Sequence, residues 1–275
     1  MANSGKVLAL RQPSASVLAK DPDFAPPAYT RPAEPALRAV PNRVVVSAPH
    51  GGSGSSQADP CALFREVSPS DRHAILSSAR QKTVPARDCI FVQGDAARHV
   101  YLVVEGYVKI HQVGATGNEV ILRLMSPGDL IKASGTGDRG THTSSAQALQ
   151  SCNVLIWEAT TFDALLERHP ILRRNEVKIH GQLLTDMEDR FREMSTEGVA
   201  HRLSRQIIRL LSKIGEQVNG DMMINLSQGE LAQLTGTTLF TVSRQLSKWE
   251  RKGFVTARRN TILVHDPDAL LEAAS

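Results

Sequence analysis

The 275-residue sequence predicts a mixed α+β fold, in which an antiparallel β-domain precedes a long helix and a second, mainly helical domain. Three observations predict it. Short apolar runs separated by glycine-containing turns fill residues 81–159. Apolar residues at heptad spacing mark residues 171–194, as in helices that pair along their length. Two short helical patterns meet at a glycine between residues 227 and 250, which is the helix-turn-helix arrangement.

The composition is that of a soluble globular protein with a mild basic excess. Hydrophobic residues make up 41%, charged residues 22%, and the formal net charge is +4. No stretch approaches the roughly 20 apolar residues of a membrane helix, and the first residues lack the apolar core of a secretory signal. Cys61, Cys89 and Cys152 are too widely spaced for a disulfide framework or a zinc site. We therefore expect a cytoplasmic protein that does not associate with a membrane.

Residues 1–60 differ in composition from the rest of the chain. They hold nine of the fourteen prolines, and residues 50–56 read as a flexible Gly/Ser linker. Such a segment has too little periodic hydrophobicity to offset its ordering entropy. We expect residues 1–60 to be mostly disordered, which leaves enough chain for two domains with their own cores.

Residues 61–168 predict the β-domain. Ser68 and Pro69 suit the N-cap and first position of a short helix that carries Ile75, Leu76 and Ala79 inward. Five apolar runs follow, at residues 89–92, 100–104, 107–110, 120–122 and 153–157. Their regular spacing favours an antiparallel sandwich or barrel. The connections are too short for crossover helices, which excludes a parallel α/β sheet.

Residues 169–194 predict a long helix that begins near Pro170. Its apolar seam is formed by Val177, His180, Leu184, Met187, Phe191 and Met194. Charged residues, including Arg190 and Glu193, flank this narrow seam. The pattern favours a helix that pairs with a second copy of itself; the alternative is packing on the β-domain of the same chain.

Residues 195–275 predict the second domain. A core-facing helix carries Val199, Leu203, Ile207, Leu210, Leu211 and Ile214, and residues 215–223 are expected to form a loop. Ser227 with Glu230 forms a capping box at the start of a helix. Gly236 ends that helix, and Thr238 suits the N-cap of a second helix. Its buried face would carry Val242, Leu246 and Trp249.

The other face of this second helix has the character of a nucleic-acid interface. Residues 239–259 contain six basic side chains and one acidic one, Glu250, and such a cluster favours DNA phosphates. A small β-wing at residues 253–264 would carry Arg258 and Arg259 at its tip. The alternative interpretation is that the basic residues form an ordinary solvent-exposed helix face. That interpretation does not explain why the capping box, the glycine turn and the basic cluster occur together. The candidate DNA-binding residues are Gln228, Thr238, Leu239, Phe240, Thr241, Ser243, Arg244, Lys248 and Arg258.

Several motifs together resemble the Crp/Fnr family of bacterial transcription regulators. They are Gly94, residues 101–106, residues 117–122, the Pro127–Asp129 turn and residues 227–255, and the resemblance covers about residues 61–270. It implies a cyclic-nucleotide-binding-type β-roll (a double-stranded β-helix), a dimerisation helix and a winged helix-turn-helix. The implied domains are 1–60 (tail), 61–168 (sensor), 169–194 (dimerisation) and 195–275 (DNA binding).

The resemblance also implies function. We expect a homodimeric regulator, not an enzyme, that binds a palindromic operator in double-stranded DNA. We also expect it to contact RNA polymerase, as an activator does. The residues do not distinguish an activator from a repressor. Phe240, Ser243 and Arg244 match the base-reading positions, and Arg244 suits guanine O6 and N7. An effector at the β-roll would bias the relative pose of the domains.

Departures from the family pattern bear on the signal. Cyclic-AMP binding in the family uses a Gly-Glu pair and an Arg-Ser pair, where this sequence has Lys132-Ala133 and His142-Thr143. These residues argue against a cyclic nucleotide. Three scattered cysteines argue against a [4Fe-4S] cluster. Ser243-Arg244 matches the Fnr-like, nitrogen- and oxygen-sensing branch more than the cyclic-AMP receptor protein.

The residues do not identify the effector. Haem that answers to nitric oxide is one candidate, with His99, His111, His142 or His169 as ligand; the ordinary interpretation is that each is a surface or core histidine. Cys61 is expected to be the most accessible thiol, and so the candidate redox sensor. Cys89 and Cys152 are expected to be inert core thiols.

Two other functional classes compete with DNA binding. A cupin-like metal oxygenase needs clustered histidines, and Thr141-His142-Thr143 supplies one. A cyclic-nucleotide-binding module that regulates a partner protein would have no use for the intact helix-turn-helix. DNA binding explains both halves of the sequence.

Overall fold

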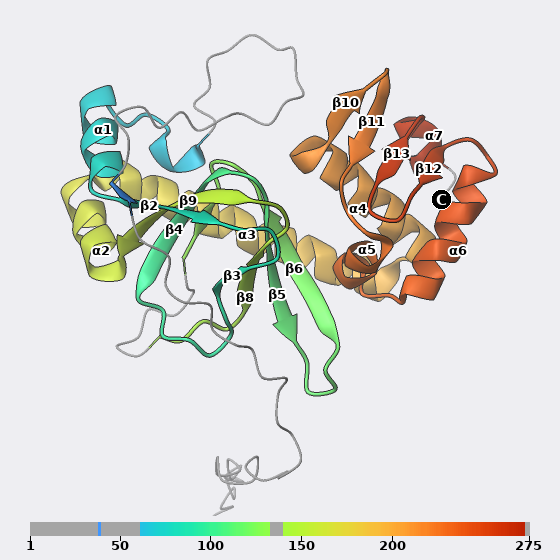
Figure 1. Ribbon diagram of the computed structural model, residues 1–275, viewed down its shortest axis with the longest axis horizontal. Helices are drawn as coiled ribbons and strands as arrows, with labels where there is room; N and C mark the ends of the chain where they lie inside the picture. Colours follow the sequence, from blue (N-terminus) through green and yellow to red (C-terminus); the bar gives the residue numbers. More distant parts are fainter. Residues whose placement is uncertain (1–37, 40–60, 133–139, 273–275) are drawn as a thin grey trace, which may run out of the picture. The chain divides into compact units, whose positions relative to one another are not determined.

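The computed structural model describes residues 38–39, 61–132 and 140–272 (Figure 1). The expected disordered tail lies outside these residues, apart from β1 (Arg38–Ala39), which pairs antiparallel with β2. Ala133 also lies outside them. No helix in the described part of the chain is long and apolar enough to span a membrane.

Two antiparallel sheets form the β-domain, which confirms the predicted sandwich (Figure 1). One has the order β1-β2-β9-β4-β7, with β2 (Arg80–Val84), β4 (His99–Glu105), β7 (Leu130–Ile131) and β9 (Cys152–Glu158). The other has the order β3-β8-β5-β6, with β3 (Cys89–Phe91), β5 (Val108–Val113), β6 (Glu119–Met125) and β8 (Ser145–Ala148). The sequence pattern did not predict β2 and β8, because the residues of these strands are mainly polar or small. Pairing with neighbouring strands in the sheets, and not their own hydrophobicity, stabilises them.

The turn between β4 and β5 depends on Gly106. Its φ is +82°, and a Cβ atom there would lie 2.6 Å from the carbonyl oxygen of Ser151. Only glycine combines this backbone conformation with so close an approach. The turn brings β4 and β5 into opposite sheets of the sandwich.

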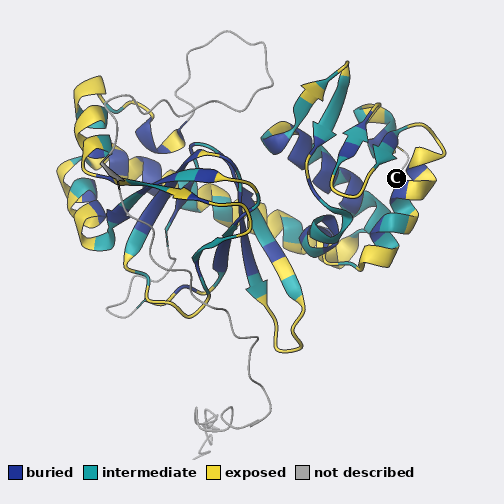
Figure 2. Cartoon of the chain, in the orientation of Figure 1, coloured by how far each residue is buried: buried dark blue, intermediate teal, exposed yellow. Residues whose placement is uncertain are grey.

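Three short helices cover one end of the β-domain: η1 (Ala62–Phe64), α1 (Pro69–Ser77) and α2 (Ala159–Arg168). Ser68 caps α1 as predicted, and its hydroxyl accepts a hydrogen bond from the Asp71 amide at 3.1 Å. Buried segments of these helices face the sheets (Figure 2). The apolar cluster there includes Trp157 and Phe162.

The expectation for two cysteines was wrong. Cys61 is fully buried because it packs in the apolar cluster that includes Trp157, and its thiol donates to the Gly128 carbonyl at 3.3 Å. Cys89 is half-buried on a short strand and is therefore the more accessible thiol. Cys152 is buried as predicted.

The long helix α3 (Pro170–Thr196) has Pro170 in its first turn, as predicted. Its first half packs on the β-domain of its own chain. The Asn175 side chain donates to the Leu63 carbonyl at 3.0 Å and to the Arg65 carbonyl at 2.6 Å. The apolar seam lies elsewhere on the helix surface, so one helix carries both a packed face and an open one.

The C-terminal domain combines helices with a small sheet. Its helices are α4 (Val199–Ile214), α5 (Gln228–Thr235), α6 (Leu239–Glu250) and α7 (Pro267–Glu272). Its strands are β10 (Glu216–Val218), β11 (Asp221–Ile224), β12 (Val255–Ala257) and β13 (Ile262–Val264), in the order β10-β11-β13-β12. The last two form the predicted wing.

The predicted loop at residues 215–223 was wrong, since β10 and β11 form a hairpin there. Asn219 and Gly220 both have positive φ, at 53° and 94°. This is the backbone conformation that Asn-Gly adopts in tight two-residue hairpins. The signal was present in the sequence, but the flanking strands are too short to show alternation.

The core of the C-terminal domain is centred on Leu203, Leu231 and Trp249, all fully buried. Ile121 and Leu124 of β6 belong to the same apolar cluster. The C-terminal domain therefore packs against the β-domain through β6.

Candidate nucleic-acid interface

The α5–turn–α6 unit is held by local polar contacts that the sequence predicted. The Ser227 hydroxyl accepts from the Glu230 amide at 3.2 Å, and the Glu230 carboxylate accepts from the Ser227 amide at 2.8 Å, so the capping box is formed. Gly236 is left-handed, with φ 61°. The Thr238 hydroxyl accepts from the Thr241 amide at 3.2 Å and caps α6. The turn angle is thus set by residues at its own ends.

The buried face of α6 fixes which side chains point outward. Val242, Leu246 and Trp249 are all completely buried in the domain core. They lie at helical spacing, so the opposite face of α6 is presented to solvent. The prediction for these three residues is confirmed.

The candidate base-reading residues lie on this open face. Leu239 is 56% exposed and Phe240 is 74% exposed, while Arg244 and Lys248 are also exposed. Ser243 is half-buried beside them. The N-terminal half of α6 therefore offers apolar, small polar and cationic groups along one face, as a helix does that enters a major groove.

The remaining candidates lie around α6. Thr238 is exposed at its N-cap, and Thr241 is half-buried in its first turn. Gln228 is half-buried at the start of α5. Arg258 is exposed in the turn of the wing, where its amide donates to the Thr261 carbonyl at 2.8 Å. Three elements thus contribute to the interface: α5, α6 and the wing.

Arg244 is oriented by an aromatic neighbour on the same helix. Its guanidinium carbon lies 5.9 Å from the centre of the Phe240 ring, at cation–π distance. Among the described residues, no ion pair involves Arg244, Lys248 or Arg258. Their charges are available to an anionic partner.

Lys132 is the residue that the resemblance places at a nucleotide-binding glycine, and it follows β7 in the β-domain. Its ammonium donates to Glu176 of α3 at 2.8 Å and to Asp163 of α2 at 3.1 Å. Burial opposes the charge, but these two hydrogen bonds and the carboxylate charges raise the pKa of Lys132 above its usual value. An ion-pair cluster therefore joins the residue that follows β7 to α2 and α3.

Replacing Lys132 by methionine is expected to lower the free energy of unfolding. Glu176, whose side chain is 11% exposed, would keep its charge without the Lys132 partner, at a cost of roughly 1.5–3 kcal/mol, the worth of a hydrogen bond to a charged group. Urea denaturation measures the change. The double variant Lys132→Met/Glu176→Gln, which also removes the carboxylate charge, should recover much of the loss. A single variant as stable as the parent protein would contradict the role of the cluster.

His142 is packed in the β-domain and does not point into solvent. It is 4% exposed and stacks on Phe91, with ring centres 3.6 Å apart. Burial lowers the pKa of His142, and nearby His99 lowers it further, while Asp95 raises it. Thr143 is exposed, and its carbonyl accepts from Gln112 at 2.8 Å. Neither residue offers the fixed positive charge that the family's arginine would give a phosphate.

The histidines considered as haem ligands have separate protein partners. His99 contacts Glu158 at 3.1 Å, and His169 lies 3.7 Å from Asp71. His111 is buried 3.9 Å from Glu119, and burial lowers its pKa. No metal-binding group of three or more His, Cys, Asp or Glu exists among the described residues.

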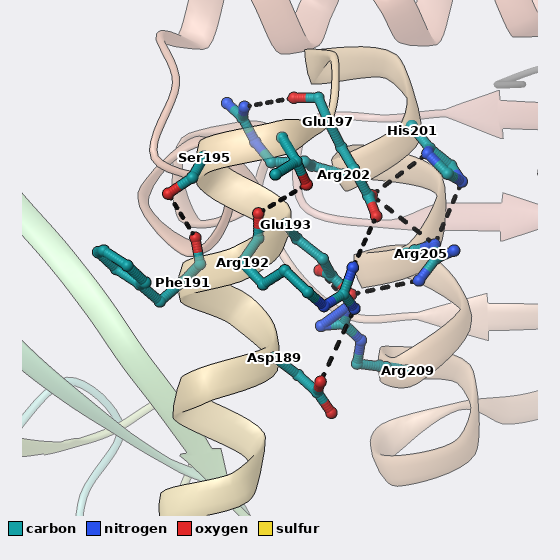
Figure 3. A network of polar contacts seen from close by, with 11 residues as sticks. Asp189, Phe191, Arg192, Glu193, Ser195, Glu197, His201, Arg202, Arg205 and Arg209 are labelled. Atoms are coloured by element: carbon teal, nitrogen blue, oxygen red, sulfur yellow. Dashed lines mark hydrogen bonds and ion pairs between the residues drawn. The ribbon is translucent and has the colours of Figure 1, made fainter.

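A polar network joins the end of α3 to α4 (Figure 3). Buried Glu193 accepts hydrogen bonds from Arg209 and lies 3.5 Å from Arg205. Glu197 pairs with His201 at 3.2 Å and with Arg205 at 3.8 Å. These contacts cross the Glu197–Gly198 link between the two helices, so they restrain the angle at which the C-terminal domain follows α3.

Arg190 makes a contact that the sequence did not predict. Its guanidinium donates to the Leu122 carbonyl of β6 and, at 2.7 Å, to the Leu234 carbonyl of α5. Arg190 and Glu193 are among the charged residues predicted to flank the seam, and the structure shows that both make buried contacts. Burial and nearby Arg209 lower the pKa of Arg190, yet an arginine stays protonated at neutral pH. One side chain of α3 therefore binds both the β-domain and the helix-turn-helix.

The predicted seam of α3 is uncovered in a single chain. Its five large apolar side chains, Val177, Leu184, Met187, Phe191 and Met194, are between 53% and 74% exposed. His180 is half-buried, with Nδ1 3.0 Å from the Glu176 carbonyl. A line of exposed apolar side chains this long is typical of a surface that a partner covers.

Two family models match the chain. The cyclic nucleotide-binding domain matches residues 81–169, and the Crp-like helix-turn-helix domain matches residues 201–273. The chain is 28% identical to the cyclic AMP receptor protein of Thermus thermophilus, over 77% of this chain and 96% of that protein. It is 24% identical to the fumarate and nitrate reduction regulatory protein of Escherichia coli, over 71% of this chain and 78% of that protein.

Solved structures agree on the fold. The c-di-GMP responsive global regulator CLP of Xanthomonas campestris superposes with a TM-score of 0.65 at 19% identity, covering 72% of this chain and 99% of that one. The two domains, their order and the long helix between them therefore form a known fold. The chain belongs to the Crp/Fnr family of transcription regulators.

Proposed function

We propose that the protein acts as a homodimer in the cytoplasm, where each copy places α6 in the major groove of one half of a palindromic operator. The single observation that carries this proposal is the open face of α6, where Phe240, Ser243 and Arg244 lie beside uncompensated basic charge. The exposed seam of α3 supplies the surface on which two copies pair. Paired recognition helices read half-sites roughly one helical turn apart.

Each part of the interface has a distinct task. Arg244 donates two hydrogen bonds to guanine O6 and N7, and so specifies a base. Lys248 and Arg258 neutralise phosphates and set affinity without sequence preference. Thr238, Thr241 and Gln228 lie at the N-terminal ends of α6 and α5, where helix ends favour phosphate oxygens. The DNA-bound dimer then contacts RNA polymerase.

The signal that controls this protein is proposed to be something other than a cyclic nucleotide. Lys132 is engaged by Glu176 and Asp163, and His142 is stacked on Phe91. These contacts fill two positions at which the family's cyclic-AMP binders hold their ligand. Together with the Ser243-Arg244 pair, they support a place on the Fnr-like side of the family.

The contacts of α3 offer a route from sensor to DNA. Arg190 holds both β6 and α5, and the Glu193–Arg209 contacts restrain the link to α4. An effector that shifts β6 against α3 would alter these hydrogen bonds and the pose of α6 with them. The β-domain and the DNA-binding face of α6 are coupled because α3 contacts the domains that carry both.

Selection of duplexes from a random-sequence pool by the full-length protein tests the proposed function. We expect an inverted repeat with half-site centres about one helical turn apart, and a stoichiometry of two chains for each duplex. A pool that stays random after repeated selection, while the protein still binds DNA without preference, would overturn the proposal.

A further inference from the structure

We infer that Phe240 and Arg244 act as one unit, which reads a guanine together with the C5-methyl group of a pyrimidine in the neighbouring base pair. That pyrimidine is thymine, and 5-methylcytosine carries the same methyl group. The inference rests on the proposed function, since it assumes that α6 enters the major groove. It goes further by naming the chemical group that an exposed phenylalanine recognises there.

The exposure of Phe240 is the first observation. The ring is 74% exposed, whereas Val242, Leu246 and Trp249 on the same helix are completely buried. It therefore contributes nothing to the core of the domain. Leu239 next to it is 56% exposed, so the first turn of α6 offers apolar surface at the end that leads into the groove. An exposed apolar surface of this kind typically packs against an apolar group of a binding partner.

The contact between Phe240 and Arg244 is the second observation. The two residues are one helical turn apart, and the guanidinium carbon lies 5.9 Å from the ring centre. The guanidinium lies over the ring, and this contact favours one orientation of the Arg244 side chain. The N–H groups at the edge of the guanidinium stay free for guanine O6 and N7. Less side-chain freedom is then lost when the base is bound.

The chemistry of the groove identifies the second group. Base edges in the major groove present hydrogen-bond donors and acceptors, and the C5-methyl of thymine is their apolar group. Successive base pairs are about 3.4 Å apart. A ring that touches a guanidinium bound to guanine is therefore within van der Waals reach of a methyl group on the adjacent base pair.

The test uses the selected operator with single thymines replaced by deoxyuridine, symmetrically in both half-sites. Burial of one methyl group is worth about a fourfold change in affinity per half-site. We expect this loss for the parent protein at one position, next to the guanine that Arg244 reads. The Phe240→Ala variant should bind the thymine and deoxyuridine duplexes equally well. Leu239→Ala, the matched control from the same turn, should keep the full response.

A second pair of duplexes tests the same methyl group on a different pyrimidine ring. With cytosine at the same position, methylation at C5 should strengthen binding by the parent protein and leave Phe240→Ala unaffected. Equal deoxyuridine sensitivity of the parent protein and Phe240→Ala would overturn the inference, and so would the absence of a sensitive position. In both cases specific binding persists, so the result differs from a failure of the proposed function, in which no operator is selected.

Discussion

Replacement of Arg244 by alanine is expected to remove most of the sequence-specific affinity for the operator. A bidentate contact to guanine is worth about 1–3 kcal/mol at each half-site, so a dimer loses roughly 2–6 kcal/mol, on the order of 30- to 20,000-fold. The fold should be unchanged, because Arg244 is exposed and no ion pair among the described residues involves it. Fluorescence anisotropy with operator and unrelated duplexes measures the loss.

The matched control is Lys248→Ala, on the same open face of α6 and one helical turn further on. Removing a phosphate-binding ammonium there should weaken binding to operator and unrelated DNA alike and reduce the salt dependence by about one ion per half-site. Arg244→Ala should instead relax the preference at one base position. If both variants weakened all duplexes equally, Arg244 would bind a phosphate and its assigned role would be wrong.

Charges placed in the α3 seam are expected to separate the dimer. Leu184 and Phe191 are 59% and 74% exposed in one chain, so Leu184→Glu/Phe191→Glu should leave the monomer folded. In a dimer, four carboxylates would be brought into an apolar interface, which costs several kcal/mol. Sedimentation equilibrium should show a monomer. Operator affinity should fall by about 100- to 10,000-fold, since the advantage of binding two linked half-sites is removed.

A control for the surface charge itself is available on the β5–β6 hairpin. Val113 and Val120 are 48% and 44% exposed there and do not belong to the apolar seam of α3. The variant Val113→Glu/Val120→Glu carries the same added charge and should stay dimeric with unchanged operator affinity. A seam variant that still sediments as a dimer would show that the pairing surface lies elsewhere.

The elements of the proposed DNA interface were predictable because short-range rules define them. The two caps and the turn are formed by residues close together in the chain. Ser227 and Glu230 cap α5, Gly236 ends it, and Thr238 caps α6. The spacing of Val242, Leu246 and Trp249 sets the face of α6. The hairpin at Asn219-Gly220 followed the same kind of local rule, although the prediction overlooked it.

Contacts between distant segments were not predictable in this way. Lys132 binds Asp163 and Glu176, which lie 31 and 44 residues further along the chain. Arg190 donates to Leu122 and Leu234, 68 residues before it and 44 after it. The sequence of a helix does not distinguish a charged side chain that extends into solvent from one that reaches a buried carbonyl. The burial of Cys61 depends in the same way on the segments that surround it in the folded chain.

The sequence by itself therefore determined the order of the elements, the helix-turn-helix, the wing and the apolar seam of α3. Periodicity and capping act over one or two turns, and their residues are adjacent in the chain. The tertiary structure alone decided which charges of α3 are buried, that the Lys132 cluster joins α2 to α3, and that one helix connects β6 with α5. Whether a charged side chain is covered depends on the element that packs over it, and local sequence carries no information about that partner.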